Sequence, residues 1–301
     1  MKKLLINTAL FSFLALLFIS CSTMQGLGAM TAAVGAAIDS PILTAVGTST
    51  ASIARASEAI TPEQEYYIGR GVAASIADTY KVANKPQVEA YLNSICQTLV
   101  INSERPVIFN GYHVAVLDTD EINAFATSGG HIFITKGKLQ CTDNEDSIAA
   151  VIAHEVAHIQ LMHSIGAIKT SRISEAVLVS AGSSLAALTT GDAQAVLNAY
   201  DNSINDIITT MVNKGYSKSQ EFDADTLALQ LMDDAGYDPY AMIDMLNLLD
   251  TRLGKSSGGF GSTHPSAKDR LKHVNKELKN YTEKAIVEAR TARFSKNMST
   301  L

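Results

Sequence analysis

The chain of 301 residues is 47% hydrophobic and 18% charged, and its formal net charge is −6. The apolar fraction excludes a disordered chain, and the acidic balance argues against a nucleic-acid-binding protein, which normally has a basic surface. Three cysteines are too few for a disulfide-dense scaffold. The length allows one large domain or two small ones, each with enough apolar material for a core.

The first 20 residues have the pattern of a secretory signal peptide. A basic start, Met-Lys-Lys, precedes an apolar run over residues 4–19, and a small residue, Ser20, stands before a cysteine. The run is shorter than the ~20 apolar residues that a membrane-spanning helix needs. We therefore expect residues 1–20 to be a cleaved signal peptide that directs the chain to the bacterial cell envelope.

Cys21 lies at the expected cleavage point. The residues before it, Phe-Ile-Ser, resemble a bacterial lipobox, although Phe18 stands where the usual pattern has leucine. The resemblance implies that Cys21 is lipidated, and its acyl chains would then anchor the chain to a membrane. By resemblance to enterobacterial lipoproteins, Ser22 favours the outer membrane, with the domain facing the periplasm. An uncleaved anchor or an ordinary signal peptide is the alternative.

Residues 21–60 are expected to form a tether. They are rich in Ala, Gly, Ser and Thr, and their charged residues before Glu58 are Asp39 and Arg55. Such a composition is typical of a flexible linker that contains short helical pieces. We expect a single domain over residues 61–301, which the tether holds away from the membrane.

The pattern after the tether predicts an α+β fold that is mainly helical. Helical spacing of apolar residues begins after Thr61, and short β-branched segments bounded by Gly and Asp interrupt it once. A small antiparallel sheet is therefore expected beside the central helix. The expected strands are 112–117, 123–126 and 132–135. A first helix is expected from residue 61, and further separate helices are expected over 86–101, 145–163, 173–188, 192–213, 218–234, 239–252 and 266–294.

Cys96 and Cys141 are the two cysteines of the expected domain. In an oxidising compartment they can form a disulfide. Two buried free thiols, which pack as small apolar groups, are the alternative. The choice depends on the distance and direction between the two side chains, which the sequence does not supply.

Residues 154–158, His-Glu-Val-Ala-His, carry the strongest chemical signal of the sequence. In a helix His154 and His158 lie one turn apart on one face, so both imidazoles can reach one metal ion. Glu155 can then approach a water on the metal without itself being a ligand. Apolar neighbours predict that this helix is buried, and buried polar groups need partners, of which a metal ion is one.

A catalytic metal site needs a third protein ligand and an open position for water. His163 lies nine residues after His154, which places it ~180° around a helix that continues to that point. Glu221 is the better candidate, because Asp225 follows one helical turn later and can hold a ligating histidine by hydrogen bond. No other Glu of the chain has an Asp four residues after it.

These motifs resemble the gluzincin zinc peptidases that include HtpX and the CAAX prenyl proteases, and especially their soluble periplasmic and lipoprotein branch. The resemblance covers about residues 65–275. Ser128 departs from it, because the family often has proline there, and the mature chain lacks the membrane spans of HtpX and the prenyl proteases. The motifs that carry it are Asn-Ala-Phe-Ala at 123–126 with Gly129 and Gly130, Asn-Glu-Asp at 144–146, Gly-Tyr-Ser at 215–217 before Gln220 and Glu221, Gly-Tyr-Asp-Pro at 236–239, and Thr-His-Pro at 263–265 with Arg270.

The resemblance implies a zinc metalloendopeptidase with one zinc ion per chain. His154, His158 and Glu221 would bind the metal, and Asp225 would hold His154 by hydrogen bond. Zinc lowers the pKa of its water and polarises the peptide carbonyl. Glu155 would take the proton of that water and deliver it to the leaving amine.

The resemblance also implies contacts with a substrate. Asn123 and Ala124 would bind its backbone, so that an extended chain adds to a sheet edge. His264 and Arg270 would lie near the open metal position and neutralise the oxyanion, or His264 would close a latent site as an extra ligand. Backbone recognition suits misfolded or unfolded envelope proteins as substrates. The alternative function is a chaperone-like or assembly-assisting envelope factor with a structural or latent zinc site.

Overall fold

A computed structural model of the chain describes residues 61–166, 215–253 and 267–301, together with Met30. Apart from Met30, these residues belong to one compact unit. Within them, no helix has both the length and the apolar character needed to cross a membrane. Several expected features lie outside the described residues, namely the signal peptide, Cys21, the tether apart from Met30, the helices over 173–188 and 192–213, and His264.

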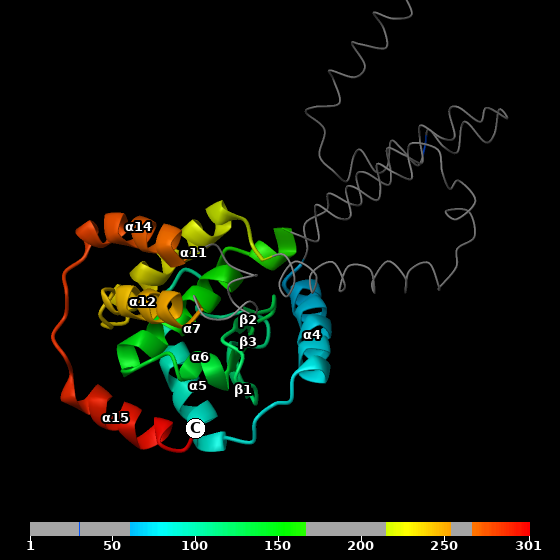
Figure 1. Ribbon diagram of the computed structural model, residues 1–301. Helices are drawn as coiled ribbons and strands as arrows, with labels where there is room; N and C mark the ends of the chain where they lie inside the picture. Colours follow the sequence, from blue (N-terminus) through cyan, green and yellow to red (C-terminus); the bar gives the residue numbers. More distant parts are fainter. Residues whose placement is uncertain (1–29, 31–60, 167–214, 254–266) are drawn as a thin grey trace, which may run out of the picture. The chain divides into compact units, whose positions relative to one another are not determined.

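The described unit is mainly helical and contains one small sheet, which confirms the expected fold class. The helices α5, α7, α11 and α12 begin and end within about three residues of the positions that the apolar spacing predicts. The elements in chain order are α4 (Pro62–Thr79), α5 (Pro86–Val100), β1 (His113–Leu117), β2 (Ala124–Ala126), β3 (His131–Thr135), α6 (Lys136–Leu139), α7 (Glu145–Gln160), α11 (Lys218–Asp234), α12 (Ala241–Leu253), α14 (Ala267–Glu277), the 3₁₀ helix η4 (Leu278–Asn280) and α15 (Glu288–Met298) (Figure 1).

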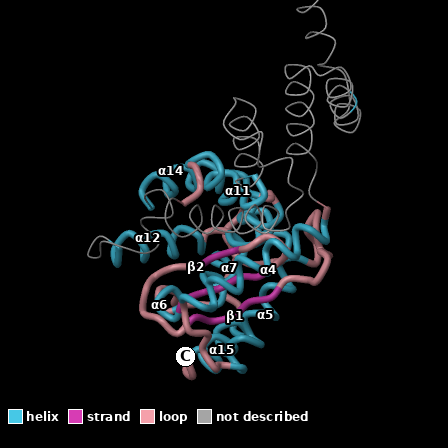
Figure 2. The backbone as a smooth tube through the Cα atoms, turned by 90° about the vertical axis from the view of Figure 1, so that its right-hand side faces the viewer, coloured by secondary structure: helices cyan, strands magenta, loops and turns pink. Residues whose placement is uncertain are grey.

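The three strands lie side by side (Figure 2). They form a mixed sheet in the order β1-β3-β2, which corrects the expectation of a wholly antiparallel sheet. β3 runs parallel to β1, with His113 opposite His131, and antiparallel to β2, with Phe125 opposite Phe133. The chain reverses between β2 and β3 through Gly129 and Gly130, which have φ of 78° and 93°. β3 is therefore the central strand, with β1 parallel to it on one side and β2 antiparallel to it on the other.

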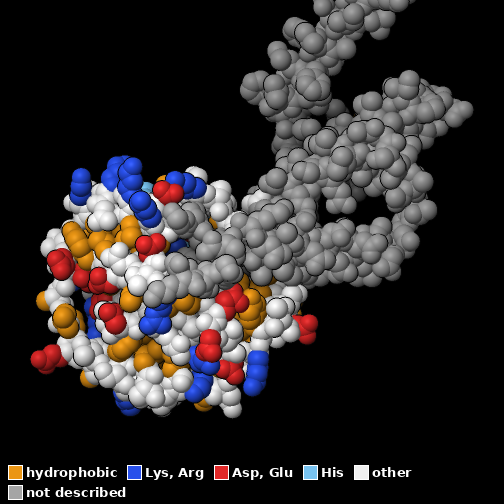
Figure 3. Space-filling model, in the orientation of Figure 1, with side chains coloured by type: hydrophobic (Ala, Val, Ile, Leu, Met, Phe, Trp, Pro, Cys, Tyr) orange, Lys and Arg blue, Asp and Glu red, His pale blue; other side chains and the backbone are white. Residues whose placement is uncertain are grey.

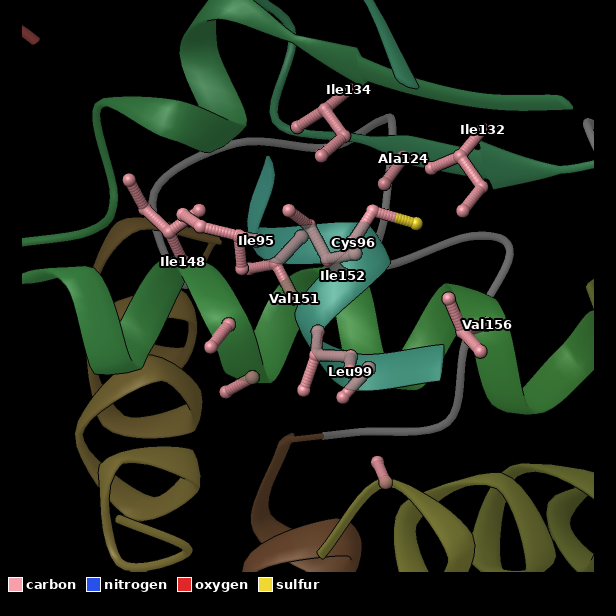
Figure 4. Close-up of a cluster of buried hydrophobic side chains, with 14 of the residues drawn as sticks. Ile95, Cys96, Leu99, Ala124, Ile132, Ile134, Ile148, Val151, Ile152 and Val156 are labelled. Carbon is pink, nitrogen blue, oxygen red and sulfur yellow. The ribbon is translucent and has the colours of Figure 1, made fainter. Parts of the chain in front are cut away.

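The two faces of the sheet pack against different helices. Ile132 and Ile134 of β3 point toward α5 and α7, where they meet Leu99 and Ile152 in a buried cluster (Figure 4). The alternate residues face the other way, as the two-residue period of a strand requires. On that face the rings of Phe125 and Tyr80 lie 5.5 Å apart, beyond the end of α4. The central helix α7 is therefore enclosed by the sheet and by other helices.

Helix α4 lies unusually close to the turn between β2 and β3. A Cβ atom at Gly69 would lie 1.4 Å from the backbone oxygen of Ser128, and one at Gly129 would lie 2.7 Å from the Cα atom of Tyr66. Real side chains do not tolerate such distances, so glycine is required at both positions. The two glycines allow the backbones of α4 and the turn to pack directly on each other.

The helices that carry the chemical motifs begin at hydrogen-bonded caps. At the start of α7, the Asn144 side chain accepts a hydrogen bond from the backbone N–H of Ser147, and the Ser147 hydroxyl oxygen accepts one from the backbone N–H of Asn144. Ser217 and Gln220 form the same arrangement at the start of α11. These capping boxes satisfy backbone N–H groups that the first helical turn leaves unpaired. They fix where each helix starts and hence which residues face the site.

The expected C-terminal helix over 266–294 is divided in the structure. Helix α14 and η4 end at Asn280, and α15 starts only at Glu288. Arg270 and Val274 form the buried face of α14, while lysine side chains cover its outer surface (Figure 3). This two-sided pattern gives α14 one face toward the core and one toward solvent.

Cys96 and Cys141 are both buried free thiols, so the disulfide that the sequence leaves open is not formed in the structure. The side chain of Cys96 lies in the apolar cluster between α5 and the sheet (Figure 4). The Cys141 thiol instead donates to the backbone oxygen of Gly137 at 3.3 Å. Each thiol is enclosed by its own neighbours, and burial raises the pKa of Cys96 to about 12, which keeps it protonated.

Candidate metal centre

Helices α7 and α11 bring three metal-binding side chains together in the interior. His154 and His158 lie one turn apart on α7, and Glu221 lies in the first turn of α11. The Glu221 carboxylate is 3.5 Å from Nε2 of His154 and 3.6 Å from Nε2 of His158, and the two Nε2 atoms are 3.2 Å apart. All three side chains are at most 2% exposed. The structure thus brings together the three side chains that the sequence singles out as donors.

The donor set of this group fits a zinc ion. One donor atom from each of His154, His158 and Glu221 lies within 4.8 Å of the other two. Two imidazole nitrogens and one carboxylate oxygen are the ligands of many catalytic zinc sites, in which a water takes the fourth position. Without an ion, three such buried polar groups would be an expensive arrangement.

The outer side of His154 is held by a buried pair of opposite charges. Nδ1 of His154 lies 3.0 Å from Oδ1 of Asp225, as the sequence predicts. Arg270 donates to the same carboxylate, through Nε at 2.9 Å and Nη2 at 2.6 Å. Burial alone would raise the pKa of Asp225, but the charge of Arg270 and the hydrogen bonds from His154 and Arg270 together outweigh burial and hold that pKa below its usual value. Asp225 therefore stays ionised and fixes the imidazole with Nε2 toward the other ligands.

Arg270 is buried behind His154. The family resemblance places it near the open metal position, and its Nη1 is indeed 3.8 Å from Oε2 of Glu221. Its Nε and Nη2 atoms, however, are engaged with Asp225, and Nη2 is also 3.2 Å from Nδ1 of His154. The guanidinium thus supports two residues of the site through direct contacts. His264, its expected companion, lies outside the described residues.

His158 is oriented by His163, a contact that the spacing argument missed. Nδ1 of His163 is 2.9 Å from Nδ1 of His158, and His163 is only 8% exposed. For His158 to bind a metal through Nε2, its Nδ1 must carry the proton, and Nδ1–H then donates a hydrogen bond to Nδ1 of His163. Helix α7 ends at Gln160, and Met162 has φ of 54°, so the chain turns back toward His158. The prediction that His163 lies ~180° from His154 requires a helix that continues to residue 163. The sequence contains no strong signal for the left-handed turn that ends it.

Tyr216 covers the other side of His158. Its ring stacks on the imidazole, with centroids 4.3 Å apart and an angle of 19° between the planes. Tyr216 directly precedes Ser217, the N-cap of α11. The capping box that positions Glu221 therefore also fixes the backbone from which the Tyr216 ring extends. The second imidazole is consequently held by His163 at its edge and by Tyr216 on its face.

Glu155 is buried beside the three donors and is 3% exposed. Burial raises the pKa of its carboxyl, while the charges of His154 and Lys138 oppose the rise. A carboxylate with a raised pKa next to a metal-binding group is typical of a general base. Lys138, on α6, is itself 2% exposed and was not among the candidates from sequence.

Strand β2 forms one edge of the sheet, and Ala124 is its first residue. The Asn123 oxygen accepts from the Thr135 amide, and the Thr127 amide donates to His131, so these odd-numbered residues face β3. By alternation, the main-chain groups of Ala124 and Ala126 face away from it. The side chain of Asn123 is bonded locally, to Glu121 and to the Ala124 amide.

Comparison with known proteins identifies relatives over most of the described unit. The model of a protein family described as Peptidase family M48 matches residues 86–278. The beta-barrel assembly-enhancing protease of Escherichia coli strain K12 is 28% identical over 212 residues, which are 69% of this chain and 42% of that protein. The mitochondrial metalloendopeptidase OMA1 of Schizosaccharomyces pombe is 32% identical over 163 residues, 52% of this chain and 43% of that protein. The chain therefore matches less than half the length of these relatives.

Proposed function

The chain belongs to peptidase family M48, and from this membership we propose that it is a zinc-dependent endopeptidase of the bacterial cell envelope. The observation that carries the proposal is the buried group of His154, His158 and Glu221, with Glu155 beside it on α7. This is the ligand set of zinc sites that leave a position for water. A zinc ion that only holds a fold together has no use for a buried carboxylate next to its ligand.

In the proposed reaction, the residues of the site have separate tasks. Zinc bound by the three donors would lower the pKa of a water and polarise the scissile carbonyl. Glu155 accepts a proton from the attacking water on a carboxylate oxygen and later gives it to the leaving amine. Asp225 and His163 keep the two imidazoles turned so that Nε2 faces the centre. Arg270 keeps Asp225 ionised while both are buried.

We propose that substrates bind as extended chains along β2. The main-chain groups of Ala124 and Ala126 face away from β3, which is the direction from which a further strand would pair. Asn123 would act by fixing the first amide of this edge. For His264 we propose a position at the open side of the site. Pairing through the backbone selects unfolded segments more than particular sequences, which suits misfolded or unfolded envelope proteins. The name of the Escherichia coli relative, a beta-barrel assembly-enhancing protease, supports this class of substrate.

The test of the activity compares wild type with Glu155→Gln in the full-length protein. We expect wild-type protein to contain about one zinc ion per chain and to cleave an unfolded protein such as casein. The Gln variant keeps a similar shape but cannot take a proton, so it should bind zinc normally and lose cleavage by at least 10²-fold. Zinc content by atomic absorption and casein cleavage by gel analysis provide the two measurements.

Undiminished cleavage by Glu155→Gln would sink the peptidase proposal. A complementation assay distinguishes the peptidase from the alternative, which is a chaperone-like or assembly-assisting factor with a structural or latent zinc site. If that alternative holds, Glu155→Gln restores a deletion strain while His154→Ala does not. If the chain acts as a peptidase, neither variant restores it.

We propose that residues 1–20 are a signal peptide, that residues 21–60 tether the domain over 61–301, and that Cys21 carries a lipid. The amino-acid pattern of residues 1–21 supports this arrangement. We expect Cys21→Ser to move the protein from the membrane fraction to the soluble fraction and to abolish palmitate labelling. Cys96→Ser, which changes a buried thiol of the domain, is the matched control. Unchanged membrane association of Cys21→Ser would contradict the lipid anchor, and sucrose-gradient fractionation distinguishes outer from inner membrane.

A further inference from the structure

Tyr216 touches the candidate metal centre, yet the scheme above uses only its ring. The ring lies flat on the imidazole of His158, with centroids 4.3 Å apart, and its centroid is 5.7 Å from that of His163. This stacking needs no hydroxyl group, because a phenylalanine ring would cover the imidazole equally well. The presence of the hydroxyl therefore calls for a separate explanation.

The hydroxyl group of Tyr216 is buried, and it has no hydrogen-bond partner among the residues that the structure describes. A buried hydroxyl without a partner destabilises a fold, since it gives up its hydrogen bonds to water and gains none. Such groups are rare in native proteins, and a role toward a bound molecule is one of the reasons for which they are found. The Tyr216 hydroxyl is thus available to a molecule that enters the site.

The ring contact places this hydroxyl beside the candidate metal centre. Tyr216 stacks on His158, whose Nε2 is 3.6 Å from the Glu221 carboxylate, and His158 and Glu155 are both buried on α7. A phenol hydroxyl has one proton that it can donate in a hydrogen bond. An attacking water that faces Glu155 and a carbonyl that reacts with it must occupy the space next to these groups. A hydrogen-bond donor at this centre is suited to a carbonyl oxygen.

We propose that Tyr216 donates a hydrogen bond from Oη to the oxygen of the scissile carbonyl as that oxygen becomes the oxyanion of the tetrahedral intermediate. The inference rests on the proposed peptidase function and adds an oxyanion donor to it. The O–H bond of Tyr216 stays intact, so the residue stabilises charge without transferring a proton. Arg270 supplies its Nε and Nη2 to Asp225, so these two groups are already used within the site.

The variant Tyr216→Phe tests the proposal in the full-length, zinc-loaded protein. Loss of one oxyanion donor lowers kcat by about 10²–10³-fold in other hydrolases. We expect a decrease in kcat of this order for casein cleavage, with KM changed by less than about twofold, since the bond forms mainly in the transition state. The matched control is Tyr240→Phe, whose hydroxyl contacts the backbone oxygen of Leu278 at 3.4 Å, and it should keep the wild-type kcat.

Two further measurements separate the hydroxyl from the ring and do not depend on turnover. An N-phosphoryl dipeptide carries a tetrahedral anion that imitates the oxyanion, and by calorimetry Tyr216→Phe should bind it at least about tenfold more weakly than wild type. The zinc-free variant should unfold at the same or a higher urea concentration, because the unpaired hydroxyl is gone. Tyr216→Leu also removes the ring that stacks on His158. Of the two variants, Tyr216→Leu should therefore weaken zinc binding and Tyr216→Phe should not.

A wild-type kcat in Tyr216→Phe overturns the proposal, as does equal affinity of wild type and variant for the N-phosphoryl dipeptide. Reduced zinc content or earlier unfolding of Tyr216→Phe also overturns it, because the hydroxyl would then be structural. The proposed function fails by a different result, which is continued cleavage by Glu155→Gln. If Glu155→Gln is inactive and Tyr216→Phe is fully active, the peptidase proposal stands and only the oxyanion donor is wrong.

Discussion

Lys138 places a long charged side chain in the interior, next to the chemistry. It is 2% exposed, and its Nζ lies 3.8 Å from the sulfur of Met245. Burial and the charge of Arg270 together lower the pKa of Lys138 to about 7, although Glu155 and Glu221 act in the opposite direction. Near neutral pH the fold therefore holds a lysine that is close to losing its proton.

The pH dependence of stability should reveal this lysine. Between about pH 7 and pH 10 the unfolded chain keeps the Lys138 proton and the folded chain loses it, so the unfolded state binds more protons. Stability from this group therefore rises with pH, by at most about 1.4 kcal/mol per pH unit. Lys138→Met should remove this contribution. The difference in unfolding free energy between wild type and variant should therefore change between about pH 7 and pH 10 and stay constant above about pH 10. Urea unfolding of metal-free wild type and variant at several pH values measures it. Identical pH profiles would contradict the assignment.

Single residues of the site differ in how far the sequence predicts them. His154 and His158 follow from spacing, because a regular helix turns residue separation into direction. Glu221 is selected instead by Asp225 one turn later and by the family resemblance, since it lies on another helix. His163 does not, since its position depends on the left-handed turn at Met162, which local sequence does not encode strongly. Tyr216 is visible in the sequence only as part of a motif, and its place on His158 depends on how α7 and α11 pack.

At the scale of elements, α15 is attached to the start of α7, the helix that carries His154 and His158. Arg293 donates to the carboxylate of Glu145 at 2.6 Å and 3.0 Å, and Arg290 donates to Asp146 at 2.8 Å. Glu145 and Asp146 lie in the first turn of α7, and Glu145 is only 1% exposed. Tyr91 of α5 also donates to Glu145, at 3.1 Å. The three helices α5, α7 and α15 thus share one buried carboxylate.

Arg293→Ala should destabilise the protein through this carboxylate. Removing Arg293 leaves the negative charge of the buried Glu145 with fewer hydrogen bonds and less opposite charge. Because half of the Arg293 side chain is exposed, we expect the free energy of unfolding to fall by about 1–3 kcal/mol. The control is Lys296→Ala, which removes a positive charge from the exposed face of the same helix and should cost less than about 0.5 kcal/mol. Chemical denaturation gives both values, and equal effects of the two substitutions would contradict the prediction.

The elements themselves were largely predictable, but their partners were not. Apolar spacing located α5, α7 and α11, β-branched runs located β1 and β3, and the segment between these two strands located β2. The parallel pairing of β1 with β3 was missed, because a strand pattern shows where a strand lies and not which strand it joins. The break before α15 was missed as well, since the residues around Tyr281 have high charge and give no clear periodic signal.

At the scale of the whole unit, the candidate metal centre joins parts that are distant in sequence. His158 comes from α7, Glu221 from α11, and Arg270 from α14, and none of these side chains is more than 1% exposed. An ion bound at this point contacts the folded chain only, since the unfolded chain does not bring the donors together. Metal binding should therefore stabilise the unit as a whole.

Removal of the metal should lower the melting temperature. At a free zinc concentration of 100 times Kd, the stabilisation is about 2.7 kcal/mol. We expect a chelator to decrease Tm of the wild type by several degrees, while His158→Ala, which lacks a ligand, should melt at the same temperature with and without chelator. Differential scanning calorimetry measures both. A chelator effect that persists in His158→Ala would show that the stabilising ion binds elsewhere.

His163 and Tyr216 connect two described stretches that are far apart in sequence. Their ring centroids are 5.7 Å apart, and both residues contact His158. The stretch that ends at Gly166 and the stretch that begins at Gly215 therefore meet at one imidazole. A substitution that displaces either ring should loosen the contact between the two stretches together with the orientation of His158.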